Sequence, residues 1–226
     1  MARILILSTA SDVLGETGKP TGVWYEELAT PYYAFLDAGH QVKLVTLGGK
    51  AVPIDPNSDV TGDDAPASVT RFRADPEATA LLENPGKLED EDVTTYDALY
   101  IPGGHGAMYD LATSDLVAKV IGTAWDNGKV VASVCHGPAA FAKAVDANGD
   151  PIVKGRKVSA FTDSEEHGVG LADAVPFLLE TRLRELGANF ESVADWQPHA
   201  VADGRLVTGQ NPASSEAAAE KVLALL

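Results

Sequence analysis

The chain has 226 residues, of which 33 are acidic and 17 basic, so its formal net charge is −16. This excess of negative charge argues against nucleic acid or an anionic membrane as a main partner, whereas a small neutral substrate would be indifferent to it. A single cysteine excludes a disulfide within the chain, and no apolar run approaches the roughly 20 residues of a membrane span. The first residues form a strand pattern without the features of a secretory signal, so we expect a cytoplasmic protein.

Short apolar runs alternate with helical patterns, and this alternation predicts an α/β fold with a mostly parallel sheet and crossover helices. The expected strands are Arg3 to Leu7, Gln41 to Leu47, Ala98 to Ile101, Lys129 to Val134, Lys157 to Ala160 and Arg205 to Thr208. The expected helices are Val23 to Ala38, Asp115 to Asn127, Pro138 to Ala144, Pro176 to Gly187 and Pro212 to Leu226.

The length and the continuous alternation predict one domain over residues 1–226. Residues 52–92 are rich in Pro, Asp and Gly and lack clear periodicity, so we expect a surface insertion there, with a short helix near Glu77 to Glu83. The acidic run from Leu88 to Asp92 is expected to be a solvated face rather than a metal site.

Cys135 directly follows the apolar run that ends at Val134 and precedes a helix start at Gly137-Pro138. A strand, sharp turn and helix in this order form a nucleophile elbow at the carboxyl edge of a sheet, as in esterases. The backbone N–H groups of the helix start would favour the thiolate and lower the pKa of the thiol. A lone cysteine is more often a small buried hydrophobe. The elbow and the adjoining His136 favour the nucleophile here.

A second strand exit carries the turn Pro102-Gly103-Gly104-His105-Gly106. Its glycines permit a tight turn with exposed N–H groups, although paired glycines are also common loop punctuation. The N–H groups of Gly104 and His136 could together stabilise an oxyanion, at about 3 kcal/mol for each well-placed donor. Gly103 and His105 are expected to line the same pocket.

Carboxylates from two further segments are candidate partners of the cysteine. Glu27 lies near a helix start, where it is either an ordinary dipole partner or a buried, protonated acid that shares a hydrogen bond with the Cys135 sulfur. Glu165 and Glu166 follow the fifth expected strand, and a carboxylate there could orient the ring of His136. The residues alone do not decide which role Glu27 has, or whether Glu165 or Glu166 orients the histidine.

These motifs resemble the ThiJ/PfpI superfamily of class I glutamine amidotransferase-like proteins, most closely its glyoxalase III branch, whose stress-induced members are also described as chaperones or deglycases. The matching stretches run in order over nearly the whole chain: Thr21 to Pro31, Ala132 to Ala139, Gly155 to Glu166 and Asp203 to Ser214. The resemblance implies a flavodoxin-like sandwich. It also implies a triad on Cys135, His136 and Glu166, the last chosen over Glu165 by its spacing from Phe161, and a pocket acid on Glu27.

The resemblance further implies a D-lactate dehydratase type of reaction that converts methylglyoxal and water to lactate without glutathione, metal or any other cofactor. Glyoxal is a second expected dicarbonyl substrate. In this chemistry the Cys135 thiolate adds to the aldehyde carbon, and a base, either His136 or Glu27, moves a proton from C1 to C2. Water then hydrolyses the lactyl thioester. No two histidines have the helical spacing of a metal site, so no metal is expected.

Other functions use the same elbow. Glutamine amidotransferases usually place their histidine far along the chain, so His136 directly after Cys135 favours the glyoxalase-like branch over an amidotransferase or a peptidase. A holding chaperone, a redox sensor or a deglycase remains an alternative.

Relatives are commonly dimers, so we expect a homodimer. Aromatic side chains at the first expected helix would provide either an interface or part of the core and pocket wall. These are Trp24, Tyr25, Tyr32 and Tyr33. Trp24 is also expected to contact the substrate.

Overall fold

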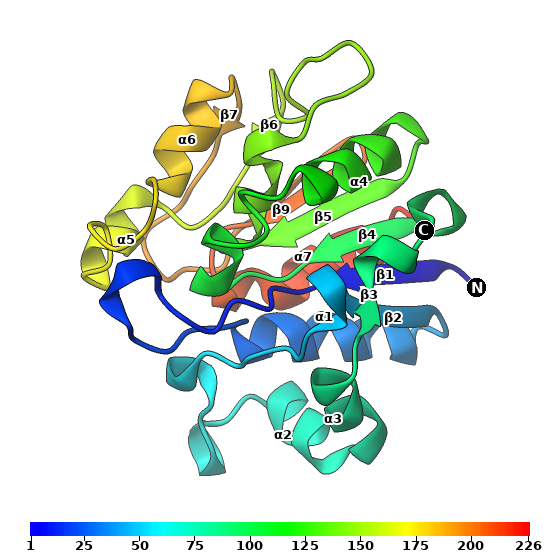
Figure 1. Ribbon diagram of the computed structural model, residues 1–226, viewed down its shortest axis with the longest axis vertical. Coiled ribbons are helices and arrows are strands. Elements are labelled where there is room, and N and C mark those ends of the chain that lie inside the picture. The colour runs from blue at the N-terminus through cyan, green and yellow to red at the C-terminus, as the bar shows by residue number, and fades with distance from the viewer.

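A seven-stranded sheet forms the centre of the fold in the computed structural model, which describes all 226 residues (Figure 1). Its order is β3-β2-β1-β4-β5-β9-β8, and only β8 runs antiparallel to its neighbour. The strands are β1 (Arg3–Leu7), β2 (Gln41–Thr46), β3 (Gly86–Lys87), β4 (Ala98–Ile101), β5 (Val130–Val134), β8 (Ala200–Asp203) and β9 (Leu206–Gly209). A separate two-stranded sheet pairs β6 (Lys157–Val158) with β7 (Asn189–Phe190).

Helices cover both faces of this sheet, as expected for a flavodoxin-like fold. The helices are α1 (Tyr25–Asp37), α2 (Ala67–Ala74), α3 (Pro76–Glu83), α4 (Asp115–Asp126), α5 (Asp163–Gly168), α6 (Leu179–Glu185) and α7 (Ser215–Leu223). Alternate residues of β1 supply the two cores: Leu5 packs on the α4 side, whereas Ile4 packs on the side of α1 and α7. Both residues are fully buried, which explains the continuous apolar runs of the central strands.

Several elements differ from those expected. The strand expected over Lys157 to Ala160 is shorter and lies outside the central sheet, paired with β7. The helix expected over Pro138 to Ala144 is a 3-10 helix, Gly137–Lys143. The short strand β8 was missed because its four residues carry little pattern, yet Asp203-Gly204 at its end is a hairpin turn signal that could have revealed it.

The segment 52–92 contains α2, α3 and β3, and α3 lies where a short helix was expected. Val69 and Phe72 of α2 are fully buried, and β3 pairs with β2 at the sheet edge. No helix of the chain combines the length and the apolar character that crossing a membrane requires.

Helix α1 contains a proline, Pro31, in its interior. Proline has no backbone N–H, so the carbonyl of Glu27, four residues earlier, receives no helical hydrogen bond from it.

The strand order reverses between β1 and β4, which are hydrogen-bonded neighbours at the centre of the sheet. Such a switch point, at the carboxyl ends of the strands, is where open α/β sheets bind ligands. These ends lie on the left in Figure 1, next to the dark blue loop after β1 and the yellow helix α5.

Candidate functional site

Cys135 lies at the carboxyl end of β5, in the left-handed backbone region with φ 58°. The backbone holds this strained turn on both sides: Cys135 N–H donates to the Gly209 carbonyl at 2.9 Å, and Phe161 N–H donates to the Cys135 carbonyl at 2.9 Å. A β-carbon at Gly137 would lie 2.4 Å from the Ile101 carbonyl oxygen, so the turn tolerates only glycine there. The expected elbow is therefore present, and its cysteine side chain is only 2% exposed.

His136 connects the cysteine to a carboxylate. Its Nδ1 lies 3.3 Å from Cys135 Sγ, and its Nε2 lies 2.6 Å from Glu166 Oε2. Burial and the neighbouring His105 lower the pKa of His136 to about 4, so the ring is neutral at pH 7. Burial alone would raise the pKa of Glu166, but hydrogen bonds from both histidines outweigh it and lower the pKa to about 2. An ionised Glu166 requires a proton on Nε2, which leaves Nδ1 as an acceptor facing sulfur.

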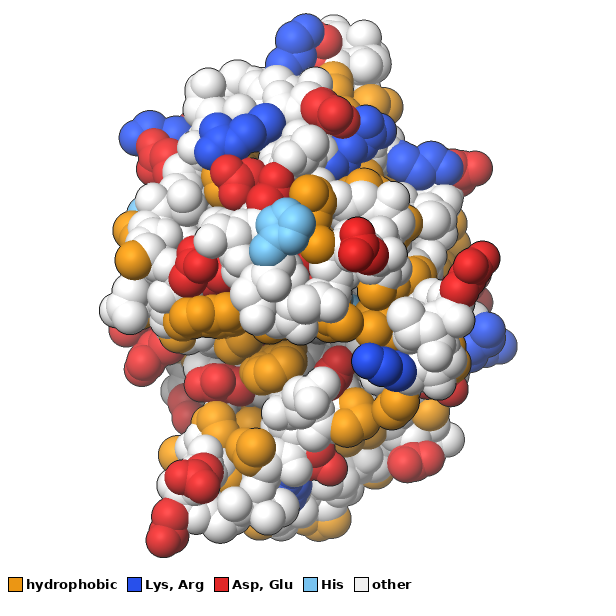
Figure 2. Space-filling view, turned by 90° about the vertical axis from the view of Figure 1, so that its left-hand side faces the viewer, with side chains coloured by type: hydrophobic (Ala, Val, Ile, Leu, Met, Phe, Trp, Pro, Cys, Tyr) orange, Lys and Arg blue, Asp and Glu red, His pale blue; other side chains and the backbone are white.

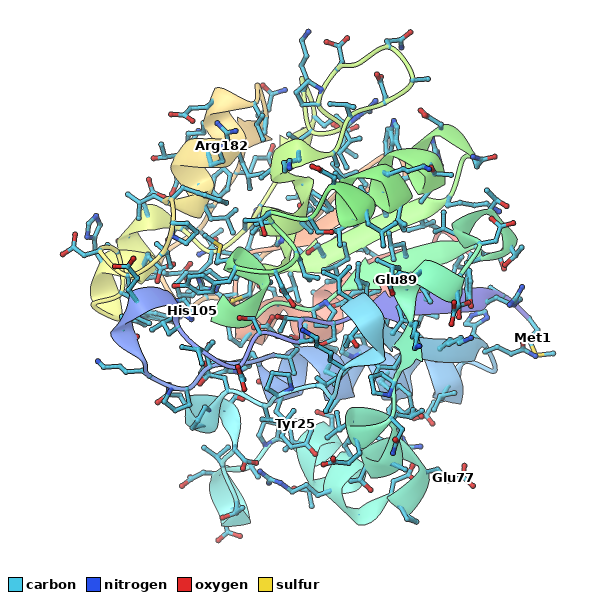
Figure 3. All side chains as sticks on the ribbon, in the orientation of Figure 1. Met1, Tyr25, Glu77, Glu89, His105 and Arg182 are labelled. Atoms are coloured by element: carbon cyan, nitrogen blue, oxygen red, sulfur yellow. The ribbon has the colours of Figure 1, made fainter.

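His105 makes the second contact to the same carboxylate. Its Nε2 lies 2.8 Å from Glu166 Oε1, and its ring lies on that of His136 with the centroids 3.9 Å apart. Sequence reasoning placed His105 in the pocket but missed this bond, because the two residues are 61 positions apart. Figure 3 shows His105 at the carboxyl end of the sheet, between the loop after β1 and α5.

Glu166 and Glu165 occupy successive positions of α5 and point to different partners. Glu165 forms a capping box with Thr162 and also accepts hydrogen bonds from Trp196 N–H at 2.9 Å and from the Asn211 side chain at 2.9 Å. Glu166 alone reaches His136. The helical register therefore separates a carboxylate that holds the loops together from one that contacts the histidines.

Glu27 approaches the cysteine from α1. Its side chain is fully buried, and its Oε2 accepts a hydrogen bond from Gly103 N–H at 2.8 Å. Its other oxygen, Oε1, has no nitrogen or oxygen partner, and the carboxyl group interacts with the Cys135 thiol. Burial raises the pKa of Glu27 to about 8, so this acid is protonated at neutral pH.

The expected lowering of the thiol pKa is wrong. The N–H groups of Gly104 and His136 do point at the sulfur and favour the thiolate, but burial and the negative charge that Glu27 would carry outweigh them and raise the pKa of Cys135 well above its ordinary value. Cys135 and Glu27 thus hold their protons in the resting site, and a thiolate forms only if a neighbouring base takes the proton.

A cavity of about 220 Å³ lies in front of the sulfur. It is lined by Trp24, Gly104, His105, Cys135, His136, Phe161, Val169, Trp196 and Pro212. Phe161 covers the His136 ring at a centroid distance of 4.3 Å, and Trp196 packs against Phe161. Trp196 was not expected from the sequence; its backbone lies at φ 66° and is held there by Glu165. Hydrophobic side chains form a band across this face of the molecule (Figure 2).

His105, His136 and Glu166 are also arranged as a group that could hold a metal ion. One ligand atom from each of His105, His136 and Glu166 lies within 4.8 Å of the others. Both Glu166 oxygens already accept hydrogen bonds from the two rings, so an ion would have to displace the protons that hold the three side chains together.

The aromatic side chains considered for a dimer interface lie inside the protein. Tyr25, Tyr32 and Tyr33 are at most 7% exposed and pack around Phe72 of α2. These three side chains therefore belong to the core and cannot form a dimer interface. The homodimer stays a prediction, without support from these aromatic residues. Only Trp24 reaches the cavity.

The sequence profile of the DJ-1/PfpI family matches residues 21–225. Glyoxalase 3 of Candida albicans is 31% identical over 98% of the chain and 96% of its own length, and the crystal structure of glyoxalase III from that yeast superimposes with a TM-score of 0.89. The structure of Rapid Encystment Protein 24 KDa from Francisella tularensis has a TM-score of 0.94 and 34% identity, covering 100% of both chains. The protein/nucleic acid deglycase HchA of Staphylococcus aureus is 28% identical over 94% of the chain and 75% of its own length.

Proposed function

Because the chain belongs to the DJ-1/PfpI family, we propose that it is a glutathione-independent glyoxalase that converts methylglyoxal and water to lactate. One observation carries the proposal: a thiol and a neutral imidazole line one small, largely apolar cavity, and a fully buried, protonated carboxyl group interacts with the same thiol. This set can add a nucleophile to an aldehyde and then move one proton between adjacent carbons, which is the chemistry that the conversion requires.

In the first step, His136 Nδ1 accepts the proton of the Cys135 thiol, and the sulfur bonds to the aldehyde carbon C1 of methylglyoxal. The imidazolium formed is stabilised by the ionised Glu166 at Nε2. The N–H groups of Gly104 and His136 point at the sulfur and therefore lie beside the new oxyanion, where each donor contributes about 3 kcal/mol. Transfer of the imidazolium proton to this oxygen gives the neutral hemithioacetal.

In the second step, Glu27 acts as the proton carrier. Its pKa of about 8 lies near neutral pH, so it can both accept and return a proton. The carboxylate form removes the proton from C1, giving an enediolate whose C2 oxygen takes the hydroxyl proton of C1, and the resulting acid returns its proton to C2. Electrons of the former C1–H bond thus reduce the ketone carbon while C1 becomes a thioester. Water then breaks the S–C1 bond, releases lactate and restores the thiol.

The direct test is lactate formation from methylglyoxal by the purified protein, read by product chromatography without added glutathione. We expect turnover in the wild type and in His167→Ala, which removes an exposed histidine beside Glu166, and no product above background in Cys135→Ala. Absence of lactate in the wild type, or equal lactate in Cys135→Ala, would refute the proposal. In the latter case, retained suppression of client aggregation by the variant would favour a holding chaperone.

A further inference from the structure

A second, larger cavity adjoins the catalytic cavity. The outer cavity has a volume of about 490 Å³ and shares Trp24, His105 and Val169 with the inner one. Its other lining residues are Leu14, Lys19, Pro20, Thr21, Asp55, Asn57 and Leu171. Sites for drug-sized ligands have volumes of roughly 300–1,000 Å³, so this space greatly exceeds what a three-carbon dicarbonyl fills.

Lys19 is the only lysine or arginine that lines either cavity. Its backbone is fixed in the loop after β1: its carbonyl accepts a hydrogen bond from Leu14 N–H at 2.8 Å, and its N–H donates to Thr17 Oγ1 at 3.2 Å. A bridge between Val13 and Pro20 closes the same loop. The ammonium group takes part in none of the ion pairs of the structure. A chain of charge −16 therefore holds an unpaired cation in the wall of the cavity that adjoins its nucleophile.

The one carboxylate in the outer wall is already occupied. Asp55 is 3% exposed, and its oxygens accept hydrogen bonds from Thr21 Oγ1 at 2.9 Å and from the backbone and side-chain nitrogens of Asn57 at 2.9 and 3.0 Å. These donors occupy the oxygens of Asp55, whereas the exposed ammonium group of Lys19 makes no ion pair. Lys19 is therefore the charged group of the outer wall that can still bind a ligand, and it would attract an anionic group.

We infer that the outer cavity is a subsite for the distal part of a larger 2-oxoaldehyde, and that Lys19 binds an anionic group, carboxylate or phosphate, at its far end. This inference rests on the proposed function, because it places the aldehyde at Cys135 and the remainder of the molecule past His105 and Trp24. Methylglyoxal fills only the inner cavity and gains nothing from Lys19.

The test compares 4-carboxyphenylglyoxal with uncharged phenylglyoxal at pH 7.4. We expect kcat/KM to be about two- to fivefold higher for the carboxylate, the range of a partly exposed ion pair, and to approach equality at 0.5 M NaCl. Lys19→Gln should abolish the preference and Lys19→Glu should reverse it, with methylglyoxal turnover unchanged in both. Lys119→Gln, which removes the same charge from exposed α4, should keep the preference. Equal rates in the wild type, or a preference that survives in Lys19→Gln, would overturn the inference.

A second readout does not need turnover. Since Cys135 is the only cysteine, its alkylation by 4-(bromoacetyl)benzoate and by the methyl-substituted neutral analogue can be followed by intact mass. The anionic reagent should react about two- to fivefold faster in the wild type and at the rate of the neutral reagent in Lys19→Gln. If no 2-oxoaldehyde is turned over but this difference is found, the glyoxalase proposal fails and the anion subsite stands. If methylglyoxal is turned over and the two reagents react equally, only the subsite is refuted.

Discussion

The rings of His105 and His136 lie against each other at a centroid distance of 3.9 Å, and their Nε2 atoms bond to opposite oxygens of one carboxylate, that of Glu166. A single ionised group therefore fixes the tautomers of both rings. Nδ1 of His136, which faces the sulfur, is kept as a hydrogen-bond acceptor. His105 stabilises the negative charge of Glu166, on which this tautomer of His136 depends.

Glu166→Gln should abolish most activity with little change in KM. The amide nitrogen cannot accept a hydrogen bond, so one of the two Nε2–H groups loses its partner. His136 can then adopt the tautomer with its proton on Nδ1, and this nitrogen can no longer accept the thiol proton. We expect kcat to fall by about 10²- to 10⁴-fold, by analogy with removal of an orienting carboxylate from a catalytic triad. Steady-state kinetics with methylglyoxal measure this. A decrease of less than threefold would show that Glu166 does not orient the base.

Glu165→Gln is the matched comparison on the same helix. Glu165 accepts hydrogen bonds from Trp196, Asn211 and Thr162, so we expect this change to lower the melting temperature while the protein that remains folded keeps a measurable kcat. Similar loss of kcat in both variants, at unchanged stability, would contradict the assignment of different roles.

His105→Phe should shift the acid limb of the kcat/KM profile. Phenylalanine keeps an aromatic ring against His136 but removes one hydrogen bond from Glu166, so the pKa of Glu166 rises from about 2. Burial is the main reason that the pKa of His136 is about 4, and His105 is the second, so that pKa rises as well. Activity requires Glu166 ionised and His136 neutral. Both changes therefore move the acid limb upward, by about one pH unit for each ~1.4 kcal/mol lost. A profile from pH 4 to 8 that coincides with the wild type would refute the coupling.

Glu27→Gln should alter the pH dependence of stability. The folded-state pKa of about 8 is above the ordinary value of 4.5. Between these two values the unfolded chain releases this proton and the folded chain keeps it, so the contribution of Glu27 to stability falls as pH rises through the window. Glutamine mimics the protonated acid and does not titrate. The free energy of unfolding of the variant should therefore increase relative to that of the wild type, by on the order of a few kcal/mol, as the pH rises from 5 to 8.5.

Urea unfolding of both proteins at these two pH values gives the difference directly. The comparison with wild type cancels the opposite effect of His136, whose pKa is lowered and which destabilises the fold as pH falls from 6.5 toward 4. Parallel stability curves for the two proteins would mean that Glu27 is ionised in the folded protein.

Cys135→Gly should be more stable than Cys135→Ala. The φ of 58° costs roughly 1–2 kcal/mol for a residue with a β-carbon and nothing for glycine, whereas glycine loses about 0.5–1 kcal/mol through the entropy of the unfolded chain. The net gain of up to about 1.5 kcal/mol corresponds to a melting temperature higher by up to roughly 3–6 °C in a protein of this size. Calorimetry on the two inactive variants tests this, and a lower melting temperature for glycine would show that the turn is unstrained.

The local pattern was sufficient to predict the parts of the fold that are built from buried parallel strands. The strands Arg3–Leu7 and Ala98–Ile101 were predicted to the residue, because strands covered on both faces are apolar throughout. Short elements such as α5 and β7 were not predicted, since six or two residues are too few to show a period.

The site was predictable where adjacent residues define it and unpredictable where distant loops do. The elbow places His136 beside Cys135 through local backbone geometry alone. The bond from His105 to Glu166 and the cover that Trp196 provides depend on how three separate loops pack. For the same reason the lowered pKa expected for the Cys135 thiol was wrong. Burial raises this pKa and outweighs the N–H groups of the elbow, and the burial arises only when the loops are assembled.

The proline in α1 has a mechanical consequence for the acid that precedes it. With no N–H at Pro31, the carbonyl of Glu27 receives no hydrogen bond from that position in the helix. What fixes the acid is its own side-chain bond to Gly103 on β4's exit loop, together with the contact of Glu27 N–H with the Trp24 carbonyl. The first turn of α1 is instead anchored to the surrounding loops: Trp24 N–H donates to the Gly103 carbonyl at 3.2 Å, and Tyr25 N–H donates to Ser58 Oγ at 3.0 Å. The position of the acid is therefore set by the loop after β4 at least as much as by its own helix.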